Sequence, residues 1–347
     1  YFVVYSHPMN NETFDTLKQL LSQPKKIVIV PHQNPDGDAM GSTLALNIFL
    51  NKLGHAAAVV SPNDYPKFLK WLPQSDGVVF FDKDNSKANI LINEAEMVFI
   101  LDFNALHRTG DAMATVLENC KATFVMIDHH QQPDVFTDFM YSDVSICATS
   151  QMVYHFIERL DYLDKMDAAI ATCLYTGIMT DTGSFKYKST TSTTHRVVAE
   201  LIDCGADNSD VHSQVYDNNS YHQLQLLGSV LKNLKVLPEY NTAYMYLTEA
   251  DKDTYNFKKG DSEGFVNYCL SIENINLAAI FIEDKVQGII KMSLRSKGDF
   301  SVNDFARNHF NGGGHINAAG GRSDVDLKAT IKKFLSVLPQ YKNDLNK

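Results

Sequence analysis

The amino-acid sequence predicts an α/β protein of two domains, in which a parallel-sheet domain is followed by a helical linker and a smaller α/β domain. In the first half of the 347 residues, short apolar runs alternate with helical patterns, as they do in parallel α/β sheets. The pattern changes near residue 236, and the length suffices for two ordinary hydrophobic cores. We therefore expect domains at residues 1–205 and 236–347, joined by a helical linker at residues 206–235.

The expected elements of the first domain alternate regularly along the chain. Helices are expected at 42–54, where apolar residues recur at helical spacing up to Gly54, at 108–120, and at 195–205, which ends at Gly205. Residues 145–180 have a helical pattern throughout. Five apolar runs are interpreted as strands, at residues 25–30, 56–61, 78–81, 97–103 and 122–130.

The second half has a different character. Residues 210–234 are expected to form a helical connector. The later runs are interpreted as strands at 243–248, 277–284 and 288–297 and as helices at 264–272 and 327–338.

Composition excludes several classes of protein. A hydrophobic content of 44% with 21% charged residues is typical of a soluble globular chain, and no run of about 18 apolar residues predicts a membrane span. The opening YFVVYSHPMN lacks the pattern of a signal peptide and has no initiator Met, so we expect no leader and a natural N-terminus that begins earlier. The five scattered cysteines, without a CxxC pair, indicate reduced thiols in a cytoplasmic protein.

The net charge of −10 is unevenly distributed. Residues 236–347 contain 14 Lys and Arg against 14 Asp and Glu, whereas residues 1–235 contain 17 against 27. An acidic domain is a poor non-specific binder of duplex nucleic acid, because contacts to phosphate need cations. It can still bind phosphate if some of its carboxylates hold divalent metal ions.

Acidic and imidazole side chains follow four apolar runs that we interpret as strands. They are His32, Asp36 and Asp38; Asp102; Asp128, His129 and His130; and Asp181. Since ligands of parallel sheets lie beyond the carboxyl ends of the strands, we expect these groups to meet. Four crowded carboxylates repel one another, and two divalent cations would neutralise the four negative charges of Asp36, Asp38, Asp102 and Asp181.

The spacing favours a cage for two metal ions. In a D-x-D pair, neighbouring aspartates can serve different ions while an aspartate from another strand bridges both. Such a pair of ions activates water and stabilises a phosphoryl group during in-line attack. Mixed oxygen and imidazole ligands suit Mn²⁺ better than Mg²⁺, which remains an alternative.

Each motif alone has a structural explanation. NPDGD is typical of a turn, Asp102 or the DTGS segment could cap a helix, and His129 and His130 could be surface residues. Their joint occurrence after apolar runs favours the metal cage.

Five stretches resemble the DHH phosphoesterase superfamily: HQNPDGDAMGS, LDFN, IDHH, DTGSF and, for its companion DHHA1 domain, NGGGHINAAGG. They occur in the order of that superfamily, and the two domains that they indicate together cover nearly the whole chain. The resemblance implies one metal ion on His32, Asp36 and Asp102 and a second on Asp38, Asp102, His129 and Asp181. It also implies that His130 faces the substrate phosphate as a catalytic group, and we assign Asp128 to orienting a neighbouring ligand.

The resemblance further implies substrate contacts. Arg295 and His315 would bind a phosphate of the substrate, since the planar guanidinium can contact two phosphate oxygens. Glycines allow close approach of backbone N–H groups to an anion, although a plain flexible loop is the alternative; these glycines are Gly312, Gly313 and Gly314. Arg108 stands where relatives bind substrate, with an ordinary arginine at a helix start as the alternative.

The favoured function is a metal-dependent phosphodiesterase that degrades short oligoribonucleotides, like the NrnA-type nano-RNases, many of which also dephosphorylate 3′-phosphoadenosine 5′-phosphate. A cyclic-dinucleotide (c-di-AMP) phosphodiesterase is an alternative that the motifs do not separate. A polyphosphatase is a third, although pyrophosphatases with this core use a different C-terminal domain. A non-catalytic binding protein would be favoured by a missing ligand, and none is missing. The expected partners are short single-stranded RNA or nucleotides. We expect no binding to membranes or to duplex nucleic acid. A homodimer is left open because relatives often form one.

Overall fold

The computed structural model describes residues 10–258 and 260–346, so most of the opening segment considered for a signal peptide lies outside the described residues. The chain divides into two compact units, Tyr1–Asn218 and Asn219–Lys347. The domain boundaries expected from the sequence stay a prediction. Among the helices of the described residues, none is long and apolar enough to span a bilayer.

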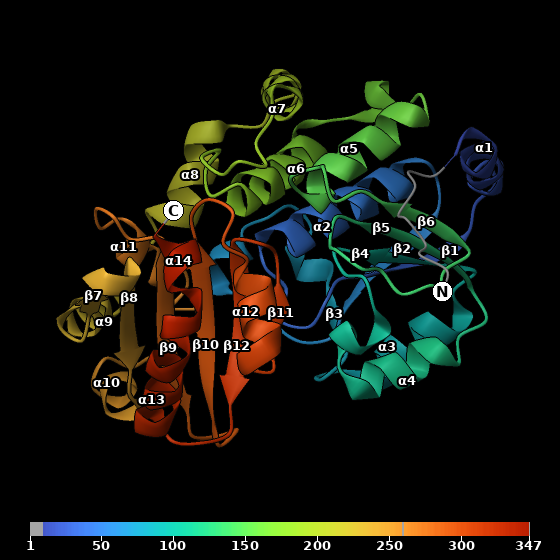
Figure 1. Ribbon diagram of the computed structural model, residues 1–347. Helices are drawn as coiled ribbons and strands as arrows, with labels where there is room; N and C mark the ends of the chain where they lie inside the picture. Colours follow the sequence, from blue (N-terminus) through green and yellow to red (C-terminus); the bar gives the residue numbers. More distant parts are fainter. Residues whose placement is uncertain (1–9, 259, 347) are drawn as a thin grey trace. The chain divides into compact units, whose positions relative to one another are not determined.

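The first unit is built around a sheet of six parallel strands (Figure 1). The strands are β1 (Lys26–Val30), β2 (Ala56–Ser61), β3 (Val79–Phe80), β4 (Met97–Leu101), β5 (Thr123–Asp128) and β6 (Phe139–Ser142). Their order across the sheet is β3-β2-β1-β4-β5-β6. The parallel α/β class predicted for this half is therefore confirmed, and the apolar runs supply five of the six strands.

Helices cover both faces of this sheet (Figure 1). The helices of the first unit are α1 (Asn11–Leu20), α2 (Gly37–Lys52), α3 (Asn85–Glu94), α4 (Asp111–Glu118), α5 (Thr149–Arg159), α6 (Ala168–Asp181), α7 (Ser192–Asp203) and α8 (Asn208–Tyr216). Alternate residues of β1 point to opposite faces: Ile27 and Ile29 pack with α2, α5 and α6, whereas Val28 and Val30 pack with α3 and α4.

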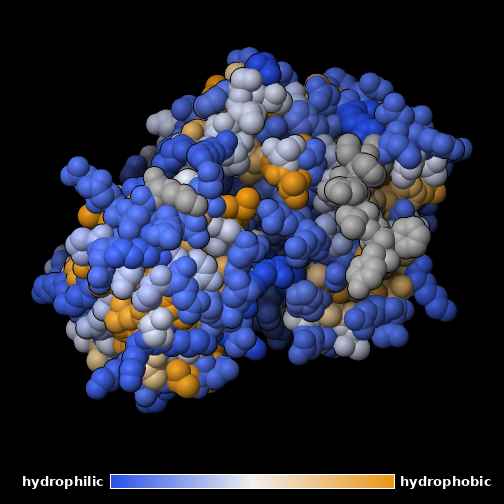
Figure 2. All heavy atoms as spheres, viewed as in Figure 1, coloured by the Kyte–Doolittle hydropathy of each residue, from blue (hydrophilic) through white to orange (hydrophobic). Residues whose placement is uncertain are grey.

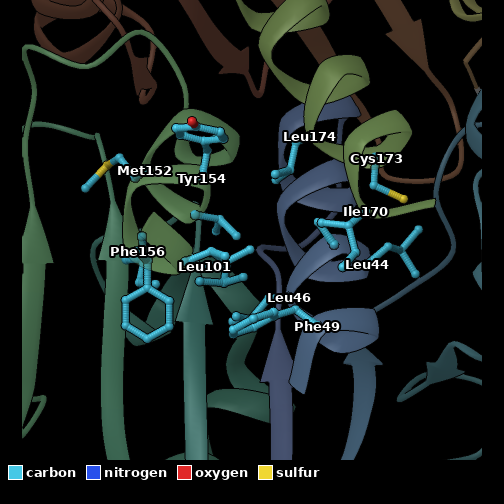
Figure 3. Packing of buried hydrophobic residues seen from close by; sticks show 14 of the residues in the cluster. Leu44, Leu46, Phe49, Leu101, Met152, Tyr154, Phe156, Ile170, Cys173 and Leu174 are labelled. Carbon is cyan, nitrogen blue, oxygen red and sulfur yellow. The ribbon is translucent and has the colours of Figure 1, made fainter. Parts of the chain in front are cut away.

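The core beneath the site lies between β4 and the helices α2, α5 and α6 (Figure 3). Leu44 and Phe49 of α2, Phe156 of α5 and Leu174 of α6 converge there, and each is fully buried. Residues 37–50 of α2 and 173–179 of α6 are all buried, as expected of helices that other elements surround. The helical pattern expected throughout residues 145–180 is interrupted, because α5 ends at Arg159 and a turn precedes α6.

The second unit contains a mixed sheet of order β11-β12-β10-β9-β8-β7. Its strands are β7 (Lys235–Leu237), β8 (Thr242–Leu247), β9 (Leu277–Asp284), β10 (Ile289–Ser296), β11 (Gly313–Gly314) and β12 (Ala318–Ser323). Its helices are α9 (Tyr221–Lys232), α10 (Glu249–Thr254), α11 (Val266–Leu270), α12 (Val302–His309), α13 (Leu327–Val337) and α14 (Lys342–Leu345). One face packs on α12 and α13 and the other on α9 and α11.

The surface seen in Figure 2 is mostly hydrophilic, with hydrophobic residues in small groups. This distribution agrees with the charged composition of the chain.

Candidate metal centre and active site

The candidate site lies at the point where the strand order of the first sheet reverses. The chain leaves β1 toward β2 on one side and later enters β4 on the other side. His32 follows β1, Asp102 follows β4 and Asp128 is the last residue of β5. Loops diverge at such a switch point and leave a crevice at the carboxyl ends of the strands, where ligands of open α/β sheets bind.

The two aspartates of the D-x-D pair belong to the start of α2. Asp36 caps the helix, because one of its carboxylate oxygens accepts the backbone N–H groups of Asp38 and Ala39, each at 3.1 Å. Its side chain is 59% exposed. Asp38, in the first turn, is buried. The helix start thus presents one open and one enclosed carboxylate.

Asp181 reaches the site from a helix and not from a strand end, which corrects the expectation from the sequence. It is the last residue of α6, because the apolar run before it is long enough to form a fully buried helix. Close packing of α2 against α6 brings Asp181 to Asp38. This packing requires small residues: a Cβ at Gly41 would lie 2.5 Å from a backbone carbonyl oxygen of α6, and a Cβ at Gly177 would lie 2.8 Å from the Asp38 carboxylate.

Two imidazoles share one orientation. Nδ1 of His32 lies 2.9 Å from the Gln33 carbonyl oxygen, and Nδ1 of His129 lies 3.1 Å from the Ile146 carbonyl oxygen. Because a carbonyl only accepts, each Nδ1 carries the proton and each Nε2 presents a lone pair. A backbone carbonyl holding the N–H of one ring nitrogen is the usual arrangement for a histidine that binds metal through the other.

The Asp102 carboxylate lies between these two imidazoles. His32 Nε2 is 3.6 Å from Asp102 Oδ2, and His129 Nε2 is 3.6 Å from Asp102 Oδ1. His129 Nε2 also lies 3.6 Å from Asp181 and 3.8 Å from Asp38. These separations exceed hydrogen-bond length, as expected of atoms that share a cation and do not bond to each other.

The structure brings the predicted metal ligands into groups whose ligand atoms lie within 4.8 Å of one another. One group is His32, Asp36 and Asp102, a second is Asp38, His129 and Asp181, and a third is Asp102, Asp128 and His130. The first two groups offer mixed oxygen and nitrogen donors, which fit a divalent cation such as Mn²⁺. Asp102 faces both groups through different oxygens.

The electrostatics of the cluster favour cation binding. Burial, and then the carboxylates of Asp38 and Asp36, raise the pKa of Asp102 well above its ordinary value. Burial also raises the pKa of Asp38. Although burial acts to lower it, the carboxylates of Asp181 and Asp38 raise the pKa of His129. A divalent cation would restore the ionised carboxylates and the neutral imidazole, so binding of metal and release of protons are linked.

Asp128 pairs with His130. The two side chains meet at 2.7 Å, between Asp128 Oδ1 and His130 Nδ1, and the other oxygen accepts the His130 backbone N–H at 3.1 Å. Burial acts to raise the pKa of Asp128, but His130 outweighs it and lowers this pKa. An ionised Asp128 therefore holds the Nδ1–H of His130, and Nε2 is the ring atom that can hold or move a proton.

The predicted substrate residues are divided between the two units. Arg108 lies in a short 3₁₀ helix, Leu106–Thr109, and its backbone carbonyl accepts the Gln33 N–H at 2.7 Å. Burial, and to a smaller extent the Arg108 charge, lower the pKa of His32, so Arg108 belongs to the neighbourhood of the cluster. Arg295 lies on β10 of the second unit, where its guanidinium donates to the Leu294 carbonyl at 3.0 Å.

The glycine triplet forms a hairpin and not an open loop. Gly313 and Gly314 pair with β12 as strand β11. The N–H of Gly314 donates to the Asn303 side chain, and the N–H of His315 donates to the Ala318 carbonyl at 2.7 Å. The N–H of Gly312 also donates within the chain, to a carbonyl of α12. The N–H groups of Gly312 and Gly314 thus have acceptors within the second unit, and a contact of the glycine triplet with a substrate phosphate stays a prediction.

The glycines satisfy a packing requirement. A Cβ at Gly314 would lie 2.5 Å from the Ala318 carbonyl oxygen, and Gly314 has a φ of +152°. A Cβ at Gly312 would overlap the Gly320 carbonyl.

Sequence reasoning missed two residues of the site, Thr149 and Ser150. Their backbone N–H groups donate to Asp38 at 2.6 and 2.8 Å, and the Thr149 hydroxyl donates to Asp102 at 2.9 Å. The available signal was the pair of hydroxyl residues before an apolar helical run.

Fold and cluster together define the class of the protein as a hydrolytic phosphoesterase with a carboxylate–imidazole centre at the switch point of a parallel sheet. Residues 26–178 match the model of the DHH family, N-terminal domain, and residues 240–343 match the DHHA1 domain. The chain belongs to the DHH family, and the resemblance noted from its motifs is confirmed.

Curated relatives extend over most of the chain. The bifunctional oligoribonuclease and PAP phosphatase NrnA of Thermus thermophilus is 29% identical over 314 residues, which are 90% of this chain and 89% of that protein. The NrnA of Bacillus subtilis, described in the same words, is 27% identical over 298 residues, 85% of this chain and 88% of that one.

Solved structures agree in fold. An exopolyphosphatase-related protein from Bacteroides fragilis is 39% identical, with a TM-score of 0.93 over the whole of both chains. RecJ from Thermus thermophilus, solved with Mn²⁺, is 14% identical with a TM-score of 0.53, over 98% of this chain and 56% of RecJ.

Proposed function

We propose that the protein is a metal-dependent phosphodiesterase that degrades short oligoribonucleotides to mononucleotides and also dephosphorylates 3′-phosphoadenosine 5′-phosphate. The observation that carries this proposal is the Asp102 carboxylate, whose two oxygens face the Nε2 atoms of His32 and His129 at 3.6 Å each. A carboxylate between two such imidazoles is the arrangement that a two-metal centre needs. The relatives named for oligoribonuclease and PAP phosphatase activity support the choice of substrate.

Two divalent ions, which we propose to be Mn²⁺, would be held by His32, Asp36 and Asp102 and by Asp38, Asp102, His129 and Asp181. When bound, such ions lower the pKa of water and stabilise charge on phosphoryl oxygens. The ring of His130, oriented by Asp128, is proposed to face the substrate phosphate and to donate a proton or a hydrogen bond to it.

Substrate binding is proposed to involve three further side chains. Arg108 lies in the first unit with the cluster, and Arg295 and His315 belong to the second unit. Each would contact a phosphate, the arginines through charge-assisted hydrogen bonds. We propose a short single strand as the substrate and not a duplex, because residues 1–235 account for the whole net negative charge of the chain.

Comparison of four substrates tests the proposal. The purified protein, loaded with Mn²⁺ or with Mg²⁺, would be given a diribonucleotide, 3′-phosphoadenosine 5′-phosphate, cyclic di-AMP and tripolyphosphate, with the His130→Ala variant as the control for contaminating nucleases. The expected result is the highest kcat/KM for the diribonucleotide. Preference for cyclic di-AMP or tripolyphosphate would replace this proposal by one of the alternatives considered from the sequence.

A further inference from the structure

The N-terminus of α5 is capped from another helix. Its own N-cap position is Ala148, which has no side chain able to accept a hydrogen bond. The carboxylate of Asp38 from α2 takes this place: Oδ2 accepts the N–H of Thr149 at 2.6 Å and Oδ1 accepts the N–H of Ser150 at 2.8 Å. Each carboxylate oxygen of Asp38, a proposed metal ligand, thus accepts one backbone N–H. These N–H groups belong to the N-terminus of α5, where the helix dipole favours negative charge.

Thr149 also holds the second central aspartate. Its hydroxyl donates to Asp102 Oδ1 at 2.9 Å, while its own backbone N–H donates to Asp38. The side chain of Thr149 is fully buried. Because Thr149 is the first residue of α5, no preceding turn of its own helix offers a carbonyl to this hydroxyl. Thr149 therefore connects the start of α2 with the end of β4 through two hydrogen bonds.

The rotation of the Asp102 carboxylate decides whether it can face two ions. The terminal torsion of aspartate is broad, so the side chain alone does not fix which way its two oxygens point. Asp102 is also the residue at which the chain leaves β4, with a φ of +65°. The hydroxyl of Thr149 fixes Oδ1 on the side of His129, which leaves Oδ2 on the side of His32.

We propose that Thr149 is a positioning residue for the metal centre, setting the rotation of the Asp102 carboxylate through its hydroxyl and the place of Asp38 through its backbone N–H. This inference rests on the proposed function, since it presumes that the cluster binds metal ions. Threonine suits the role because its branched side chain is stiff about χ1 and keeps the hydroxyl in one direction.

Direct measurement of Mn²⁺ binding tests the proposal without any substrate. Thr149→Val keeps the shape of the side chain and removes the hydroxyl. Titration calorimetry on chelator-stripped protein should show Mn²⁺ affinity lowered about 10- to 100-fold at both sites, as for other groups that orient metal ligands. Thr149→Ser, which restores the hydroxyl, should stay within about threefold of the wild type.

A matched control separates this role from general packing. Thr43 of α2 is also fully buried, but its hydroxyl donates to the Ala39 carbonyl of its own helix at 2.8 Å. Thr43→Val should therefore leave Mn²⁺ affinity unchanged. If Thr149→Val does not fold, Thr149→Ala removes the same hydroxyl without crowding and should show the same loss of affinity.

Two results would overturn the proposal. One is a hydroxyl-free variant that binds Mn²⁺ with wild-type affinity, and the other is a Thr149→Ser variant that loses as much affinity as Thr149→Val. A wild-type protein that binds no Mn²⁺ would instead refute the metal centre itself, and with it the proposed function.

Discussion

Replacement of Gly177 by alanine should disturb the metal centre through a single methyl group. Gly177 lies in α6, where an added Cβ would be 2.8 Å from Asp38 Oδ1 and 2.8 Å from Ser150 Cβ. Rotation of the Ser150 hydroxyl would not relieve these contacts. Since ordinary contact begins at 3.4 Å, α6 must move by about 0.6 Å away from the start of α5, or Asp38 must move.

The expected effect on stability is modest, and the expected effect on function is large. Overpacking of this kind costs about 1–3 kcal/mol. Alanine in place of glycine inside a helix stabilises the helix by about 1 kcal/mol. We therefore expect the free energy of unfolding to fall by about 0–2 kcal/mol in total. A shift of a catalytic group by about 1 Å can lower turnover about 100-fold. Mn²⁺ affinity should fall with it, because Asp38 is a proposed ligand.

Calorimetric Mn²⁺ titration and diribonucleotide turnover, together with thermal unfolding, measure these effects. Gly228→Ala is the matched control, since Gly228 lies within helix α9 and a Cβ there meets no atom within 4 Å. The control should be equally active and slightly more stable. Wild-type Mn²⁺ affinity in a folded Gly177→Ala protein would refute the argument that close packing of α2, α5 and α6 sets the position of Asp38.

Four further outcomes are expected. Asp102→Ala should lose both bound Mn²⁺ ions and all turnover while staying folded, and metal analysis that still finds two ions per chain would exclude its bridging role. His130→Ala should keep its metal but turn over about 10²–10⁴-fold more slowly, and loss of metal instead would make His130 a ligand. Arg295→Ala should lower diribonucleotide turnover much more than that of p-nitrophenyl phosphate, whereas equal losses would indicate a role in the fold.

The fourth outcome concerns Asp64: partial burial acts to raise its pKa, but hydrogen bonds from Lys70 and Lys83 lower it to about 2. Its ion pairs stabilise the fold above about pH 4 and lose this effect as the pH falls toward about 2. Because the Asp64 side chain is 37% exposed and screened by solvent, Asp64→Asn should cost only about 1 kcal/mol at pH 7. Urea unfolding should show this difference closing in acid, and a difference independent of pH would exclude the charge as its cause.

The sequence predicted what depends on local pattern and missed what depends on packing. The apolar runs marked β1, β4 and β5, because these signals lie within a few residues. The helix expected from residue 42 begins earlier, at Gly37, because its N-cap Asp36 lies within the turn-like residues NPDGD. Strand β6 was missed, since four residues carry too little periodicity. The glycines of residues 311–321 suggested an anion-binding segment or a plain flexible loop, whereas their absent side chains allow a hairpin to close.

The candidate site shows the same division. Its candidate metal ligands could be named in advance because the order of the motifs indicates them. The partners of those ligands could not, because the contacts of Thr149 with Asp38 and Asp102 join residues 111 and 47 positions apart. The helix before Asp181 was expected from the helical pattern of residues 145–180, but Asp181 was also counted among the strand ends, since a buried helix and a buried strand both appear as apolar runs.

The wide separation of the ligands along the chain has a consequence for how the first unit assembles. The cluster draws on residues from His32 to Asp181, so no early fragment of the growing chain can form it. Contacts of such long range close late in folding, since the entropy of the intervening loops opposes them. Metal ions that bind at that stage would bind the native state alone and would therefore stabilise the whole sheet and not one loop. In a cell, scarcity of the metal would then shorten the lifetime of the protein as well as its activity.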